Sequence, residues 1–95
     1  MVIYVITMLW YDTNDNQRYD DILSECFTDF EKAKAYLDSE IMEEYNNLIK
    51  NGGDYYITDY NDNGCYEREI WFENSEYEDM LMRYTIRKVN LAHNN

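Results

Sequence analysis

The stretch Thr28–Gly53, TDFEKAKAYLDSEIMEEYNNLIKNGG, decides the fold. Its first four residues have a capping-box pattern, in which the Thr28 hydroxyl accepts the Glu31 amide and Glu31 reaches back to Thr28. Apolar side chains then recur every three or four positions, which places them on one stripe of a helix; they are Phe30, Ala33, Leu37, Ile41, Tyr45 and Leu48. Gly52 and Gly53 follow as a helix stop. The stretch therefore predicts one long amphipathic helix that buries a single face.

Two strands are predicted before this helix. The run Val2–Tyr11 is rich in β-forming residues and carries large side chains on both alternating faces, which is typical of an interior strand. The polar residues Asp12–Asp21 predict a loop or an extended hairpin tip. Ile22–Phe27 is then a short second strand, which we expect to run antiparallel to the first.

Three strands are predicted after the helix. Tyr55–Tyr60 and Cys65–Glu73 flank Asn63-Gly64, a pair that favours the left-handed conformations of a tight hairpin turn. The polar residues 74–79 predict a connection, and Met80–Leu91 is predicted to be a long final strand. Residues 92–95 are expected to form a frayed tail.

One segment is open to a second interpretation. Ser75-Glu76-Tyr77-Glu78 repeats the capping-box pattern, and Tyr77, Met80, Leu81 and Tyr84 fit helical spacing. A short helix between Glu76 and Tyr84 is therefore the alternative to a connection that leads directly into the last strand.

The predicted order is β-β-α-β-β-β, an α+β fold in one domain spanning residues 1–95. It consists of one antiparallel sheet with a single long helix packed on one face. Because one helix covers only part of a five-stranded sheet, the other face must meet water, a second copy or a partner. The candidates for this open face are Tyr56, Thr58, Tyr60 and Trp71.

The chain is strongly acidic, with 20 acidic and 8 basic residues and a formal net charge of −12. Between Asp38 and Asp79, thirteen acidic residues accompany only two basic ones, Lys50 and Arg68. A content of 45% hydrophobic and 17% aromatic residues is too high for a disordered acidic tail. A folded domain this negative repels itself, so we expect the charge to serve something other than stability. It also argues against direct binding to nucleic acid or to an anionic membrane.

Few residues could carry chemistry. His93 is the only histidine and lies in the predicted tail, so no catalytic pair with Ser or Cys can be placed on a rigid element. Cys26 and Cys65 lie in predicted strands and are expected to be small buried hydrophobic side chains. Asp59-x-Asn61-x-Asn63-Gly64 matches the first half of a calcium loop, but the twelfth position is Ile70 instead of the required Glu. We expect no enzymatic activity, no catalytic residue, no bound metal and no cofactor.

The acidic residues instead predict a protein-binding surface. Glu67, Glu69 and Glu73 alternate along one face of a predicted strand, about 7 Å apart at each two-residue step. Regularly spaced carboxylates can imitate duplex DNA, which carries one negative charge per roughly 1.7 Å of axis. Tyr66, Tyr77 or Trp71 could anchor the contact. The predicted partner-binding residues are Asp38, Glu40, Glu43, Glu44, Glu67, Glu69, Trp71, Glu73, Glu76, Glu78 and Asp79.

In kind, the chain resembles the small acidic proteins of phages and mobile elements that inhibit host defence nucleases, among them anti-CRISPR proteins and other DNA mimics. The resemblance rests on size, on the acidic segment 38–79, on the lack of catalytic motifs, and on 11 tyrosines, many asparagines and no proline, which fit an AT-rich genome. It covers no alignable motif, so no functional residue is carried over. It implies an inhibitor that occupies the basic DNA-binding groove of an enzyme such as a CRISPR effector nuclease.

A second class of function stays open. The chain could be a self-associating structural or regulatory domain, with its uncovered sheet face forming a homodimer and its charge serving solubility. We expect no signal peptide or transmembrane helix, because the apolar run 2–11 opens without basic residues and is too short to span a bilayer. The expected location is the cytoplasm, that of the host cell if the protein is phage-encoded, with both thiols reduced.

Overall fold

The computed structural model describes residues 1–12, 17–62, 65–73 and 78–91, and the side chains of residues 1–10, 26–62, 65–73 and 81–91. The chain forms five strands and one helix in these ranges. In chain order they are β1 (Val2–Asp12), β2 (Gln17–Phe27), α1 (Phe30–Lys50), β3 (Tyr55–Asp62), β4 (Cys65–Glu73) and β5 (Glu78–Asn90).

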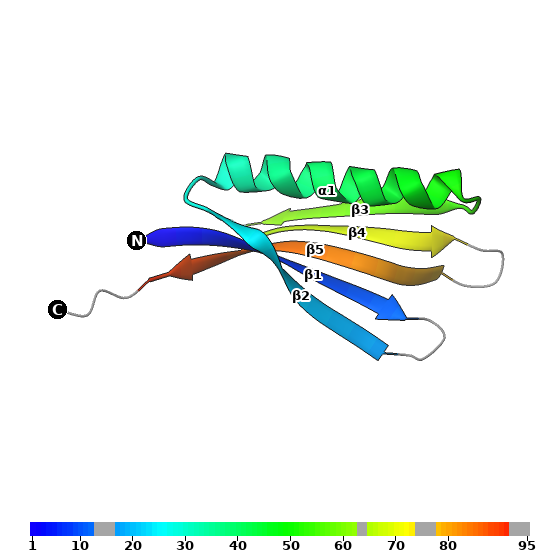
Figure 1. Ribbon diagram of the computed structural model, residues 1–95, viewed down its shortest axis with the longest axis horizontal. Helices are drawn as coiled ribbons and strands as arrows, with labels where there is room; N and C mark the ends of the chain where they lie inside the picture. Colours follow the sequence, from blue (N-terminus) through cyan, green and yellow to red (C-terminus); the bar gives the residue numbers. More distant parts are fainter. Residues whose placement is uncertain (13–16, 63–64, 74–77, 92–95) are drawn as a thin grey trace.

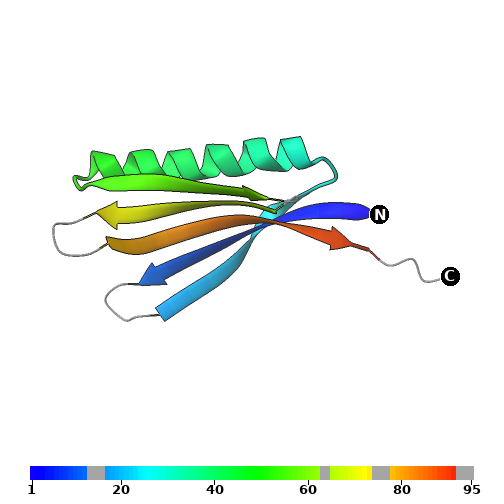
Figure 2. The same ribbon diagram turned by 180° about the vertical axis from the view of Figure 1, so that it is seen from behind.

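The strands form one sheet in the order β2-β1-β5-β4-β3, and every neighbouring pair is antiparallel. Helix α1 lies along one face of this sheet and connects its two edge strands, β2 and β3 (Figures 1 and 2). The predicted α+β class, with one antiparallel sheet and a single helix on one face, is confirmed for the described residues. Strand β1 is interior, as its bulky sequence predicted.

Strand β2 begins at Gln17, earlier than predicted from the sequence. The polar residues 17–21 pair with residues 8–12 of β1, so most of the segment expected to be a loop or an extended hairpin tip is strand, in keeping with the second alternative. The hairpin partner supplies the backbone hydrogen bonds of an edge strand whatever the polarity of its side chains. The register shifts between Val5 and Thr7, which pair with Cys26 and Ile22, so the irregularity lies within the predicted strand Ile22–Phe27.

Strand β5 also begins earlier than predicted, at Glu78 instead of Met80. The alternative of a short helix is wrong for residues 78–84, because Tyr84 pairs with Arg68 of β4 and with Met8 of β1. Its backbone groups are therefore used by the sheet on both sides. The predicted turn at 63–64, residues 74–77 of the predicted connection and the predicted tail 92–95 lie outside the described residues.

Asp29 caps the N-terminus of α1 in place of the predicted Thr28. Its extended backbone (φ −120°, ψ 123°) turns the side chain toward the first turn, where Oδ1 accepts the Glu31 amide at 2.9 Å. The C-terminus follows the prediction, since the helix ends at Lys50 and Gly52 takes a φ of +88°. Gly53 has a φ of +144°, and a Cβ there would lie 2.7 Å from Cε2 of Tyr55.

The core lies between α1 and the sheet. The predicted apolar stripe faces inward: Ala33, Leu37 and Ile41 are fully buried. They pack on Ile6, Ile70 and Ile86 of the three middle strands. Partly buried aromatic rings pack against this core toward the helix ends. Burial of each large aliphatic side chain contributes roughly 1.5–3 kcal/mol. The ring pairs at these ends are Tyr4–Phe30, Phe27–Tyr36 and Tyr55–Phe72.

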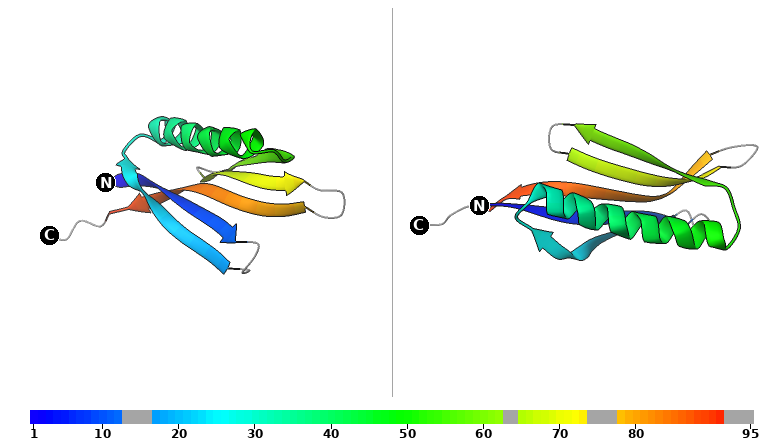
Figure 3. Two further views of the ribbon diagram at one scale, coloured as in Figure 1. Left: turned by 45° about the vertical axis from the view of Figure 1, so that its right-hand side comes forward. Right: turned by 90° about the horizontal axis from the view of Figure 1, so that it is seen from above.

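The helix crosses the sheet obliquely, so the end of the β3–β4 hairpin lies beyond it (Figure 3, right). Residues 59–62 of β3 are accordingly exposed. The opposite side of the sheet, which we call the open face, carries no helix. Tyr55 and Ile57 pack against the core, so alternation along β3 places Tyr56, Thr58 and Tyr60 on the open face. Trp71 joins them as the cross-strand partner of Tyr56, which confirms the four predicted open-face residues.

Candidate functional site

The predicted partner-binding residues divide between two sides of the molecule. The acidic residues from 38 to 44 belong to α1, whereas Glu67, Glu69 and Trp71 of β4 lie on the open face. Glu73 is exposed at the end of β4. Glu76 lies outside the described residues, and Glu78 and Asp79 belong to β5, with side chains that are not described. No single acidic face gathers all of them.

Asp38 is engaged beneath the helix. Its Oδ1 accepts the Tyr66 hydroxyl at 2.7 Å and Nη1 of Arg68 at 3.1 Å. Nε of Arg68 lies 3.5 Å from Oδ1 of Asp59, close enough for an ion pair but without a hydrogen bond. Burial raises the pKa of Tyr66, and the hydrogen bond to Asp38 raises it further. Asp38 therefore joins α1 to β4 and offers little to a partner.

Glu67 and Glu69 are held by their neighbours on the open face. Nε of Arg83 of β5 donates a 2.8 Å hydrogen bond to Oε2 of Glu69, and Nη2 forms an ion pair with the same oxygen at 2.8 Å. Nε also lies 3.9 Å from Oε2 of Glu67. Thr58 and Thr85 donate hydroxyl hydrogen bonds to the remaining oxygens of Glu69 and Glu67. The alternation predicted along β4 is present, but a cation from the next strand offsets the charge.

The predicted aromatic anchors have different surroundings. Tyr66 is only 5% exposed and lies in the core, so its prediction as an anchor is wrong. Trp71 is half-buried and stacks on Tyr56, with ring planes 9° apart. Its indole N–H is buried without a hydrogen-bond partner among the described residues, so packing holds this ring. Tyr77 lies outside the part of the chain that the structure describes.

Three carboxylates remain together on α1: Glu40, Glu43 and Glu44, which we call the helix patch. Residues three and four apart are neighbours on a helix surface, and like charges at these spacings destabilise a helix by a few tenths of a kcal/mol. No ion pair joins any of the three to a cation within the described parts of the chain. The patch therefore keeps its negative charge.

Tyr84 of β5 lies within the electrostatic field of the helix patch. It is only 3% exposed and packs in the core under the helix. Burial raises the pKa of its phenol, and the charges of Glu44, Glu40 and Glu43 raise it further, in that order. All three carboxylates thus act on the same buried phenol.

The linear charge density of the helix patch is about two thirds of that of DNA. Five helical residues, from Glu40 to Glu44, occupy about 7.5 Å of axis and carry three negative charges, which is about one charge per 2.5 Å. Duplex DNA carries one per roughly 1.7 Å. Over one helical turn, the patch therefore offers a basic groove a density of negative charge of the same order.

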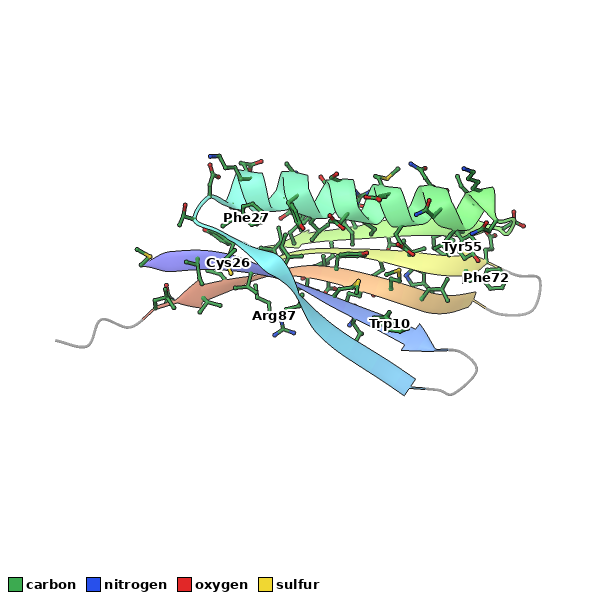
Figure 4. The ribbon with its side chains drawn as sticks, viewed as in Figure 1. Trp10, Cys26, Phe27, Tyr55, Phe72 and Arg87 are labelled. Carbon is green, nitrogen blue, oxygen red and sulfur yellow. The ribbon has the colours of Figure 1, made fainter. Side chains whose placement is uncertain are left out.

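Trp10 is a candidate contact residue that the sequence interpretation missed. It is 40% exposed, and alternation along β1 places it on the helix side, one two-residue step beyond Met8, the cross-strand partner of Tyr84. Exposed Trp side chains are enriched among residues that dominate protein interfaces. Its place near the end of an interior strand gave no sign of exposure, because such strands are normally covered. Trp10 is one of the side chains labelled in Figure 4.

Other predicted sites fare differently. Cys26 and Cys65 are free and exposed, so the prediction that they are buried is wrong; they lie on an edge strand and at a hairpin end, where covering is poor. Asp59 and Asn61 of the partial calcium motif lie on β3, an extended strand rather than a loop. Within the described residues, no group of three or more His, Cys, Asp or Glu side chains could hold a metal. His93 lies outside them.

Among the described residues, no helix is long and apolar enough to cross a membrane.

Comparison with protein-family models, with curated proteins and with solved structures finds no match.

Proposed function

We propose that this protein is a small acidic binding protein that inhibits a nucleic-acid-handling enzyme by occupying its basic DNA-binding groove. The observation that carries the proposal is the helix patch, where Glu40, Glu43 and Glu44 lie side by side without a compensating cation among the described residues. An arrangement that lowers helix stability and leaves charge uncompensated suits a contact made with a partner.

The proposed mechanism is occlusion without turnover. Lysine and arginine side chains that normally hold phosphates would pair with the helix patch, and Trp10 would supply apolar contact beside it. The net charge of −12 would steer the encounter and raise its association rate at low salt. Because α1 forms the outer layer of the molecule, the patch can enter a groove without any change of fold.

The proposed partner is a basic nucleic-acid-binding protein, and the resemblance to inhibitors of host defence suggests a defence nuclease such as a CRISPR effector. Direct contact of this chain with nucleic acid is not proposed, since both carry strong negative charge. The proposal includes no catalysis and no cofactor. Its cellular setting is the cytoplasm of the cell in which that enzyme works.

The test begins with capture of host proteins on the immobilised chain at about 0.05 M and about 0.5 M salt, with identification by mass spectrometry. The proposal predicts capture of a nucleic-acid enzyme at low salt and its loss at high salt. A variant with Glu40→Gln, Glu43→Gln and Glu44→Gln should capture at least tenfold less of it. The purified enzyme should then be inhibited by the wild type and not by this variant.

The matched control is Glu31→Gln, Asp54→Asn and Asp62→Asn, which removes three exposed charges elsewhere and should behave as the wild type. Equal loss in both variants would show that only net charge matters and would contradict the role of the helix patch. Capture unaffected by the three Gln substitutions, or capture of no nucleic-acid enzyme, would contradict the proposed function.

A further inference from the structure

Among the described side chains, the centre of the open face is the region where charge is balanced. It carries two carboxylates, Glu67 and Glu69, and two guanidinium groups, Arg83 and Arg87, on the neighbouring strands β4 and β5. Asp62 and Glu73 lie at the two ends of the β3–β4 hairpin, and Glu73 is the cross-strand partner of Glu78 of β5. On a chain of net charge −12, this is where a second copy can approach with the least repulsion.

The same face carries apolar and aromatic side chains that the core does not use. Leu9 is only 7% exposed but does not belong to the core cluster, since alternation along β1 directs it away from the helix. Ile3 and Val5 share its side of β1, and Val89 of β5 pairs with Ile3. Together with the stacked Tyr56 and Trp71, they surround the balanced charges with apolar surface.

We infer that the open face binds a second copy of this chain, sheet against sheet, in a weak symmetric dimer. Strands lie about 4.8 Å apart and rise about 3.3 Å per residue, so four strands over seven residues offer on the order of 500 Å² per copy. The pair would bury about 1,000 Å², near the lower limit for a specific interface. A dimer that forms only at high micromolar concentration is the expectation.

Arg87 supplies charge complementarity across this interface. It is exposed, and its Nε donates only a long 3.4 Å hydrogen bond to Thr7 among the described residues. In the proposed dimer its guanidinium would pair with a carboxylate of the second copy. Both α1 helices would remain outermost, so the dimer would present two helix patches and does not depend on the proposed function.

The test is sedimentation velocity of the full chain from about 10 µM to about 1 mM, a range that brackets a weak interface of this size. The expected result is a shift from 11.6 kDa toward twice that mass. Added salt should strengthen the dimer, because it screens repulsion between two negative copies. It should weaken a complex with a basic partner, so the two proposals fail or succeed separately.

Two substitutions of equal charge locate the interface. Val89→Arg lies on the open face at 36% exposure, and Met42→Arg lies on α1 at 38% exposure. Val89→Arg should lower dimer affinity at least tenfold, whereas Met42→Arg should dimerise as the wild type, with circular dichroism confirming that both fold. A wild type that stays at 11.6 kDa throughout, or a dimer lost only in Met42→Arg, would overturn the inference.

Discussion

At the scale of single residues, neighbours decide which carboxylates can act on a partner. Asp38 accepts hydrogen bonds from Tyr66 and Arg68, and Glu69 accepts a hydrogen bond from Arg83 and forms an ion pair with it. Glu40, Glu43 and Glu44 have no such cation among the described residues. Acidic residues that look alike in the sequence therefore divide into structural and available groups.

Replacement of Asp38 should destabilise the fold. Asp38→Ala leaves the Tyr66 hydroxyl and the Arg68 guanidinium without their shared acceptor, so a loss of about 1–3 kcal/mol in the free energy of unfolding is expected. Urea denaturation measures it, with the exposed neighbour Ser39→Ala as a control that should change stability by less than about 0.5 kcal/mol. Equal effects of the two substitutions would contradict a structural role for Asp38.

The buried phenols predict a loss of stability in alkali. Burial raises the pKa of Tyr66 and Tyr84 in the folded chain above the ordinary value of 10.0. Stability should therefore be unaffected by these two groups below about pH 10 and should fall above it, because only the unfolded chain then releases their protons. The double variant Tyr66→Phe, Tyr84→Phe should lose less stability between about pH 9 and 11.5 in urea denaturation. If the free energy of unfolding fell equally with pH in both proteins, this would argue against the raised pKa values of Tyr66 and Tyr84.

Residue-level features could be predicted from the sequence only where they are local. The glycines after α1 have one common use at a helix end, and they were placed correctly. The ion-pair partner of Glu69 could not be predicted from the sequence. Arg83 lies on another strand, and only the register of β4 and β5 brings the two residues opposite each other. The exposure of Cys26 depends in the same way on β2 being an edge.

At the scale of elements, α1 was predictable because its apolar stripe records one buried face over 21 residues. Strand starts were less predictable. Residues 17–21 carry no apolar pattern, and their pairing with β1 follows from the hairpin instead of from their own sequence. The helix cap was misplaced by one residue, since Thr28 and Asp29 are both good caps and only backbone geometry separates them.

That distinction is testable. Asp29→Ala removes the acceptor of the Glu31 amide and should cost about 1 kcal/mol of stability, within a usual range of about 0.5–2 kcal/mol. Thr28→Ala should cost a few tenths at most. Thermal unfolding followed by circular dichroism compares the two. A larger loss for Thr28→Ala would restore the capping box predicted from the sequence.

At the scale of the whole molecule, the net charge of −12 should act against folding. A rise in salt from about 0.01 M to about 0.15 M shortens the screening length from about 30 Å to about 8 Å, so the unfolding midpoint should increase. The increase should be smaller when Glu40, Glu43 and Glu44 are replaced by Gln. A midpoint that falls with salt would mean that ion pairs such as Arg83–Glu69 outweigh the repulsion.

The sequence predicted an acidic protein with an uncovered sheet face, and both features describe the whole molecule. It did not predict that the uncompensated acidic charge and the uncovered sheet face lie on different sides of the molecule. The open face carries balanced charge around Arg83 and Arg87, while unpaired charge gathers on the helix. Strand pairing brings these arginines beside the glutamates, and this long-range contact has no signature along the chain.

The central claim is that the helix patch takes the place of DNA in a basic groove. Its most direct test is competition between this protein and duplex DNA for the captured enzyme, measured as the inhibitor concentration that halves activity at increasing DNA. The account predicts that this concentration rises in proportion to DNA, and that the Glu40→Gln, Glu43→Gln, Glu44→Gln variant needs at least ten times more protein. A half-inhibitory concentration that does not change with DNA, or one equal for variant and wild type, would contradict it.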